Sequence, residues 1–256
     1  MKSRQQITLA VCRWAAWAPG VADTPSWHAW AEGVKTINGP VAPDVQFVAP
    51  MMRRRLSGLS RMVFRVAVDC LAVEENSVAY VFCSRYGEYN RSYGILTDLA
   101  NGEPASAAAF SNSVHNTSAS LFAIERQDTS QSTAVAGGEA TLETAFMEAW
   151  SLLSDGIAPA VLVVYHDEPL PDLYRGQPTT VLNNAAFAML LRLPDSRRDA
   201  IDLRLSWDPQ EENPAEPCTA SDPALQVLGL LLKGGDPVVL DTQRLVWTWS
   251  TSDEAA

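Results

Sequence analysis

The chain has 256 residues, with 19 Lys and Arg against 30 Asp and Glu, so its formal net charge is −11. Nucleic acids and anionic membranes bind clustered cations, so an acidic chain of this kind is not expected to have either as a partner. Cys12, Cys70, Cys83 and Cys218 lie far apart without CxxC spacing, which predicts no metal site and no disulfide framework and fits a reducing cytoplasm. We expect a single domain over residues 1–256 that needs no cofactor.

The N-terminus carries basic residues before an apolar stretch, as a signal peptide does. Arg13 interrupts that stretch and two tryptophans follow it closely, so a first β-strand that ends before Pro19 and Gly20 is the better interpretation. A short capped helix should begin near Thr24, and prolines with one Asn-Gly pair predict a loop over 33–50. No apolar run reaches the roughly 18 residues that a membrane-spanning helix needs.

The middle of the chain alternates between helical and strand patterns. Apolar residues recur at three- and four-residue steps from Met52 to Cys70, which predicts one long amphipathic helix. A strand "SVAYVFCS", a helix "SYGILTDLANGE" and a further strand "SLFAIER" should follow. A second helical stripe runs from Leu142 to Leu153.

The C-terminal part begins with "APAVLVVYHDEP", a run of apolar and β-branched residues typical of a strand covered on both faces. The segments "AFAMLLRLP" and "IDLRLSW" are predicted to form a strand pair. Residues 207–222 are acidic and rich in proline, so we expect an exposed linker there. A C-terminal stub over 223–256 should contain one helix and a last strand or strand pair. This alternation of strands and helices predicts an α/β domain with helices layered over a mixed β-sheet.

Four segments resemble, in order and spacing, the N-terminal half of β-ketoacyl synthases of the thiolase fold. They are "RRRLSGLSRMVFRVAVDC", "PASAAAFSNSVHNTSASLFAIE", "QSTAVAGGEATLETAFMEA" and "VLVVYHDEPLP", within roughly residues 7–195. The likeness is greatest to the short, chain-length-factor-like proteins that accompany ketosynthases in bacterial type II systems making aryl polyenes. The openings "WAAWAPG" and "WHAWAEG" look like that subgroup. The resemblance implies a thiolase-like fold, as half of the ketosynthase fold.

The third segment contains the turn at which catalytic members of the family carry their nucleophile. Their pattern is Ser-Thr-Ala-Cys-Ala-x-Gly, whereas this chain reads "STAVAGG" with Val135 at the cysteine position. A cysteine there attacks a thioester because the helix N-terminus favours its thiolate, and valine has no group to ionise. The family also uses two histidines from its C-terminal half, and no histidine follows His166 here. The resemblance therefore implies a non-catalytic subunit, although these residues alone also fit a plain Gly-Gly turn.

Two residues keep open the alternative of a stand-alone enzyme acting on acyl thioesters. His115 fits a base paired with Ser113 or Asp128, or a structural histidine near a dimer interface. Cys83 ends an apolar strand, where it fits either a nucleophile or a small buried hydrophobe. The adjacent residues His166 to Glu168 alternate between the two faces of a strand and should not converge on one metal ion.

The run Arg53, Arg54 and Arg55 forms a local basic patch on an acidic chain. The resemblance suggests that it docks an acidic acyl carrier protein with a phosphopantetheine-bound acyl chain. An ordinary solvated face with ion pairs to nearby carboxylates explains the run equally well. A scaffold that docks carrier protein without touching the acyl chain is therefore a third functional class.

A lone half of the fold should leave a large apolar face exposed, which normally implies an obligate partner. By resemblance that partner is a full-length ketosynthase in a heterodimer, paired through a strand at Leu121–Gln127. The expected role is control of chain length, in which this subunit closes the far end of the partner's acyl tunnel. The candidate interface and tunnel residues are Phe110, Ser113, His115, Asn116, Thr133, Ala134 and Val135.

Overall fold

The computed structural model describes most of the chain. The described residues are 5–40, 42–71, 77–174, 181, 183–194, 200–210, 222–242 and 244–251. Most of the predicted linker, 211–221, lies outside these residues, as does Cys218. None of the described helices is both long and apolar enough to cross a membrane.

The described strands form one mixed eight-stranded sheet in the order β3-β2-β4-β5-β1-β6-β8-β7. Their bounds are β1 Gln5–Trp17, β2 Val78–Cys83, β3 Ser132–Val135, β4 Ala160–Asp167, β5 Ala185–Arg192, β6 Ile201–Pro209, β7 Val238–Asp241 and β8 Leu245–Thr251. Strand β2 runs parallel to β3 and β4, and the remaining neighbours are antiparallel. Every residue of β4 is buried, which confirms the strand predicted from its apolar run.

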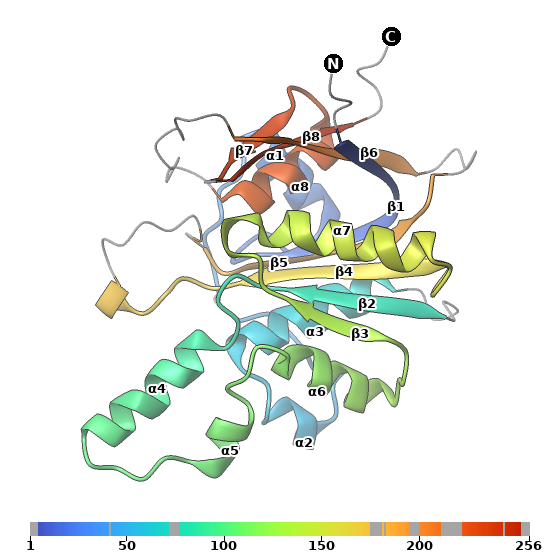
Figure 1. Ribbon diagram of the computed structural model, residues 1–256. Coiled ribbons are helices and arrows are strands. Elements are labelled where there is room, and N and C mark those ends of the chain that lie inside the picture. The colour runs from blue at the N-terminus through green and yellow to red at the C-terminus, as the bar shows by residue number, and fades with distance from the viewer. Residues whose placement is uncertain are drawn as a thin grey trace.

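Helices cover both faces of this sheet, which confirms the predicted layered α/β architecture (Figure 1). Their bounds are α1 Thr24–Ala31, α2 Pro50–Arg53, α3 Gly58–Cys70, α4 Tyr89–Ala100, α5 Ala107–Ser111, α6 Thr117–Arg126, α7 Thr141–Ser154 and α8 Pro223–Lys233, with short 3₁₀ turns η1 Gly138–Ala140 and η2 Asp172–Tyr174. Helices α2, α3 and α6 share one apolar core with the sheet. Helices α1, α7 and α8 share the other.

Helices α4 and α5 project from the layered body, and we call residues 89–114 the arm (Figure 1). Every residue from 96 to 108 is exposed. Four large apolar side chains of the arm are exposed: Leu96 (61%), Leu99 (52%), Phe110 (68%) and Val114 (52%). The arm thus presents apolar surface that the body of this chain does not cover.

The predicted strand "SLFAIER" is wrong, because this segment belongs to helix α6. Its buried positions include Thr117, Ser118, Leu121 and Phe122, and this spacing puts them on one helical face against α3. The helix ends at Gln127, whose φ of 53° is left-handed. The expected pairing of a strand at Leu121–Gln127 with a partner is therefore also wrong.

Three further boundaries differ from the predictions. The single helix expected from Met52 to Cys70 is interrupted, because Ser57 caps a new helix by accepting from the Ser60 backbone N–H at 2.9 Å. Strands β5 and β6 both form but do not pair, since the long β1 lies between them and pairs with each over a different half. Both ends of the linker expected over 207–222 differ from the prediction. Strand β6 extends to Pro209, and Asp222, the last residue of the expected linker, is buried.

The C-terminal elements cover part of the apolar surface of α7. Figure 1 shows the sheet bending so that β8 and β7 lie on the opposite side of α8 from β5. Trp249 of β8 is fully buried, and its ring packs edge-on against Phe146 of α7 with centroids 4.7 Å apart. Met147 and Trp150 keep some exposure on α7. The exposed large apolar side chains among the described residues are thus spread over several elements, including α7 and the arm.

Candidate functional site

The turn with Val135 lies at the carboxyl end of β3, an edge strand. Val135 is the parallel neighbour of Cys83, and its carbonyl accepts from the Ser84 backbone N–H at 3.2 Å. The chain then passes through η1 into α7, so a strand, a glycine turn and a helix N-terminus follow one another as the sequence predicted. The half-buried Val135 side chain packs against the core beneath α7.

Residues of the same chain border a small gap close to this turn. The first turns of α7 and α8 line it together with Arg85 and Tyr165. The half-buried Arg85 also lies 3.7 Å from the exposed Glu139, a pair that contributes little to stability. The gap has a volume of about 20 Å³, close to that of one water molecule. This gap is therefore too small to hold an acyl thioester.

Cys83 does not have the surroundings of a nucleophile. Its side chain has 0% exposure, and burial raises the pKa of its thiol well above the usual value, with further contributions from Asp167 and Glu143. The thiolate is the reactive form of cysteine, and this environment disfavours it strongly. The geometry thus favours the interpretation of Cys83 as a small buried hydrophobe.

His115 bonds to the backbone rather than to either of its expected partners. Its Nε2 donates to the Ser84 carbonyl at 2.8 Å. Ser113 Oγ instead donates to the Phe110 carbonyl, and Asp128 accepts from the Tyr80 hydroxyl. No catalytic pairing of His115 with Ser113 or Asp128 is therefore formed in this structure.

Asp167, which the sequence analysis considered only with its neighbours as a possible metal ligand, is a buried carboxylate that organises the loop after β2. Asp167 accepts from Ser84 Oγ at 2.7 Å and from the backbone N–H groups of Arg85 and Tyr86 at 2.9 and 3.3 Å. Burial raises the pKa of Asp167, and these hydrogen bonds oppose that rise. The signal in the sequence was an aspartate at the end of a mostly apolar strand. Its role here is to fix the loop that leads into the arm.

The neighbours of Asp167 do not form a metal site with it. His166 is buried, and burial lowers its pKa to about 4. Glu168 lies toward α3, where its Oε2 is about 4.0 Å from the position of a Cβ added at Gly58. Within the described ranges, no three His, Cys, Asp or Glu side chains gather closely enough to hold an ion.

The predicted interface residues fall into two separate groups. Asn116, Thr133 and Ala134 line one groove of about 520 Å³ between α6 and the edge strand β3. Phe110 lies apart from them on the projecting arm, with Ser113 at the end where the arm returns to the body. These residues thus mark two surfaces rather than a single pocket.

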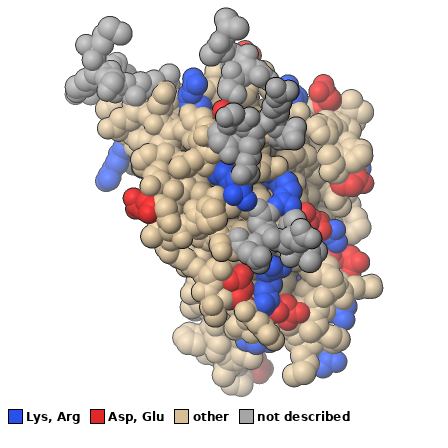
Figure 2. All heavy atoms as spheres, turned by 90° about the vertical axis from the view of Figure 1, so that its right-hand side faces the viewer, with Lys and Arg blue, Asp and Glu red and all other residues tan. Residues whose placement is uncertain are grey.

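The basic run lies at the end of α2 and in the link that follows it. Arg54 and Arg55 are exposed and Arg53 is half-buried. The carbonyl groups of Arg53 and Arg55 accept from Arg61 and Arg91, at 3.0 and 3.3 Å. Figure 2 shows basic and acidic side chains interspersed over the face that it presents. Docking of a carrier protein by this run therefore stays a prediction.

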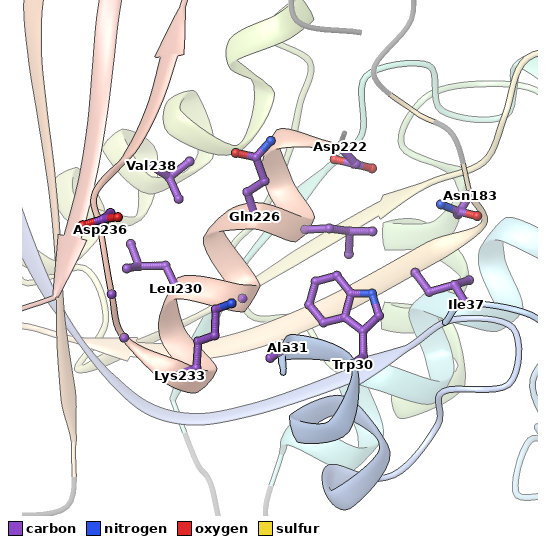
Figure 3. Close-up of a pocket in the computed structure, with 14 residues that line it drawn as sticks. Trp30, Ala31, Ile37, Asn183, Asp222, Gln226, Leu230, Lys233, Asp236 and Val238 are labelled. Carbon is purple, nitrogen blue, oxygen red and sulfur yellow. The ribbon is translucent and has the colours of Figure 1, made fainter. Parts of the chain in front are cut away.

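A groove of about 690 Å³ runs along α8, opposite α1, and no predicted site residue lines it. Figure 3 shows Asp222 and Asn183 at one end and Lys233 at the other, with Trp30 across from the helix. A Cβ added at Gly229 would lie 3.7 Å from the Trp30 ring, an ordinary contact distance, so the approach of Trp30 to α8 does not require a glycine there.

Asp222 caps α8 at one end of this groove. Its Oδ1 accepts from the Ala224 backbone N–H at 3.0 Å, while its Oδ2 is buried without a partner in the described part of the chain. Burial, and next the charge of Asp167, raise the pKa of Asp222 to about 7. Because Oδ2 is sealed from the groove, it offers nothing to a ligand there.

Comparisons with known proteins agree with this architecture. The family model described as "Beta-ketoacyl synthase, N-terminal domain" matches residues 27–250. No curated protein matches the sequence. A chain from the structure of the ketosynthase ApeO in complex with its chain length factor ApeC, from Xenorhabdus doucetiae, is 30% identical. The match covers 95% of this chain and 99% of that one, with a TM-score of 0.78.

Two more distant structures share the fold. A chain of the ishigamide ketosynthase/chain length factor is 14% identical with a TM-score of 0.75, over 96% of this chain and 99% of that one. The ketosynthase from module 6 of the bacillaene synthase of Bacillus subtilis is 12% identical with a TM-score of 0.58. That match covers 89% of this chain but 46% of the longer one. The chain therefore belongs to the β-ketoacyl synthase family and has the N-terminal half of its thiolase-like fold.

Proposed function

We propose that the protein is a non-catalytic, chain-length-factor-like partner of a β-ketoacyl-acyl carrier protein synthase. The observation that carries this proposal is Val135, which occupies the nucleophile position of a turn that is otherwise retained. The gap between the first turns of α7 and α8, close to this turn, is also too small to hold an acyl thioester. A subunit of this kind contributes to the reaction through its partner and not through a nucleophile of its own.

The partner is a full-length ketosynthase, by likeness to the complex of ketosynthase and chain length factor from Xenorhabdus doucetiae. The outer edge of β3 has no neighbouring strand among the described residues, so its backbone groups are free to pair with another chain. The groove with Asn116, Thr133 and Ala134 lies directly beside this edge. This surface takes the place of the strand that was expected at Leu121–Gln127.

The arm supplies the second contact with the ketosynthase. Its exposed side chains Leu96, Leu99 and Phe110 form apolar surface far from the body, and such surface is typical of a protein interface. An aromatic side chain projecting from this subunit has the size and polarity to close the end of an apolar acyl tunnel. We assign this role to Phe110, with Ser113 at the base of the same segment.

The same likeness places the complex in a cytoplasmic type II pathway of the aryl polyene or fatty-acid-like kind. An acyl carrier protein would then deliver the growing chain on its phosphopantetheine arm. The exposed Arg54 and Arg55 are the described side chains that we assign to docking it.

Co-expression with the ketosynthase of the same pathway tests this proposal. Native mass spectrometry should find a 1:1 heterodimer, and Phe110→Ala should shift the products of the complex toward longer chains. Leu99→Ala is the matched control, because Leu99 lies on the same arm but outside the proposed tunnel end. Unchanged product length in a Phe110→Ala complex that assembles normally would contradict the tunnel role. Failure of the wild-type chain to form any heterodimer would contradict the function itself.

A further inference from the structure

The orientation of the arm depends on the two points where it leaves and rejoins the body. All residues from 96 to 108 are exposed, so this outer part is not packed into the body of the protein. The chain leaves the body through the loop after β2 and returns just before α6. Any group that fixes the arm must therefore lie at its base.

The carboxylate of Glu88 occupies this base and is 3% exposed. Its Oε1 accepts from Ser57 Oγ at 2.7 Å and from Ser60 Oγ at 2.9 Å. Its Oε2 accepts from Arg91 Nε at 3.1 Å. Ser60 Oγ is in turn 3.0 Å from Ser118 Oγ. A buried carboxylate is costly unless it is paired and hydrogen-bonded, and Glu88 satisfies both conditions.

The first turns of three helices meet at this carboxylate. Ser57 and Ser60 begin α3, Glu88 itself directly precedes α4, and Ser118 lies in the first turn of α6. Helix N-termini carry partial positive charge and stabilise an anion placed against them. One negative charge at this point therefore favours a single arrangement of α3, α4 and α6.

Further hydrogen bonds join the two ends of the arm to each other. Ser92 Oγ, one turn into α4, donates to the Ser113 carbonyl at 3.4 Å. His115, which follows the arm in the sequence, donates from its Nε2 to the carbonyl of Ser84, which precedes the arm. Gly87 makes this contact possible, since its φ is 57° and a Cβ there would come within 2.9 Å of the His115 ring. The two ends are thus held side by side. Glu88 attaches the pair to α3, and Asn90 Nδ2 attaches α4 to the segment after β4 by donating to the Pro169 carbonyl at 3.0 Å.

We propose that Glu88 is a positioning residue whose carboxylate fixes the arm in the orientation that binds the partner. The part of this inference that concerns the partner rests on the proposed function. The part that concerns the orientation of the arm does not, because it follows from the contacts of Glu88 within this chain. The two parts are therefore tested by different measurements.

Electron paramagnetic resonance measures the orientation of the arm directly. Spin labels are placed at Glu103 near the tip of the arm and at Asp155 on the body, with Cys12 and Cys218 replaced by Ser. The wild-type background should give one narrow distance distribution, and Glu88→Ala should broaden it. Glu88→Gln keeps an acceptor for the serines but lacks the charge, so it should fall between the two. Asp98→Asn, which changes an exposed carboxyl group on α4, is the matched control and should change nothing.

Affinity for the ketosynthase then tests the consequence of a loosened arm. We expect Glu88→Ala to weaken binding of the ketosynthase about tenfold and Glu88→Gln to weaken it less. The loss of affinity should follow the same order as the broadening of the distance distribution. An unchanged distance distribution in folded Glu88→Ala would overturn the positioning role. If Glu88→Ala does not fold, an unchanged distance distribution in Glu88→Gln would overturn the positioning role instead. A broadened arm together with a wild-type chain that binds no ketosynthase would refute the proposed function and leave the positioning role standing.

Discussion

The buried carboxyl group of Glu143 should make the stability of this fold depend on pH. The carboxyl group lies in the first turn of α7 with 2% exposure, and its Oε1 accepts from Trp249 Nε1 at 2.8 Å. This bond ties the C-terminal strand β8 to the helix that follows the Val135 turn. Burial raises the pKa of Glu143 from 4.5 to about 7, and the bond from Trp249 opposes that rise.

The sign of the effect follows from the direction of this shift. Because the unfolded chain releases the Glu143 proton near pH 4.5 and the folded chain near pH 7, the folded protein loses stability as pH rises through this window. At about 1.4 kcal/mol for each pH unit, the loss reaches roughly 3 kcal/mol at pH 8 and is about 1.4 kcal/mol at pH 5.5. The amide introduced by Glu143→Gln would keep an acceptor for Trp249 and would not ionise. The free energy of unfolding of Glu143→Gln relative to that of the wild type should therefore increase by about 2 kcal/mol from pH 5.5 to pH 8.

Urea unfolding followed by tryptophan fluorescence measures this difference at pH 5.5 and pH 8. Asp222 titrates near pH 7 in both proteins, so its contribution cancels when the variant is compared with wild type. Glu103→Gln, which changes an exposed carboxyl group, should show no such dependence on pH. A Glu143→Gln variant with the same difference from wild type at both pH values would refute the reasoning.

Three further predictions concern the proposed site. Iodoacetamide should leave native Cys83 unmodified and label half-buried Cys12, as peptide mapping would show; labelling of Cys83 at the rate of Cys12 would reopen the stand-alone enzyme. Val135→Cys should assemble normally and restore no condensation, whereas Val135→Asp should reduce heterodimer recovery in size exclusion because a carboxylate buried without a partner costs several kcal/mol; full recovery would contradict this. Replacing Arg53–Arg55 by Ala should slow the complex more at low salt than at high salt, since exposed charge pairs are screened, and an equal loss at every salt concentration would point to damaged folding.

The elements with strong periodicity could be predicted from the sequence. The apolar run of β4 and the apolar stripe of α7 each show, within a single segment, which residues are buried. The segment of α6 was misassigned because a short stretch with Leu, Phe and Ile suits a strand as well as a helix. Its packing against α3, far away in sequence, decides between the two.

The candidate site was predictable where it depends on a local turn and not where it depends on distant contacts. The turn at Val135 is specified by neighbouring residues, and the structure places it between a strand and a helix as expected. The serine partners of Glu88 are 28 and 31 residues away in sequence, and Ser84 and Asp167 are 83 apart. No local pattern reveals such pairs, because the fold brings them together.

We propose that this chain takes part in condensation without carrying the acyl group. The intact mass of both subunits, measured after the purified heterodimer has been incubated with an acyl-acyl carrier protein thioester, tests this proposal. We expect an acyl adduct on the ketosynthase and an unmodified mass for this chain. An acyl adduct on this chain would overturn the proposal.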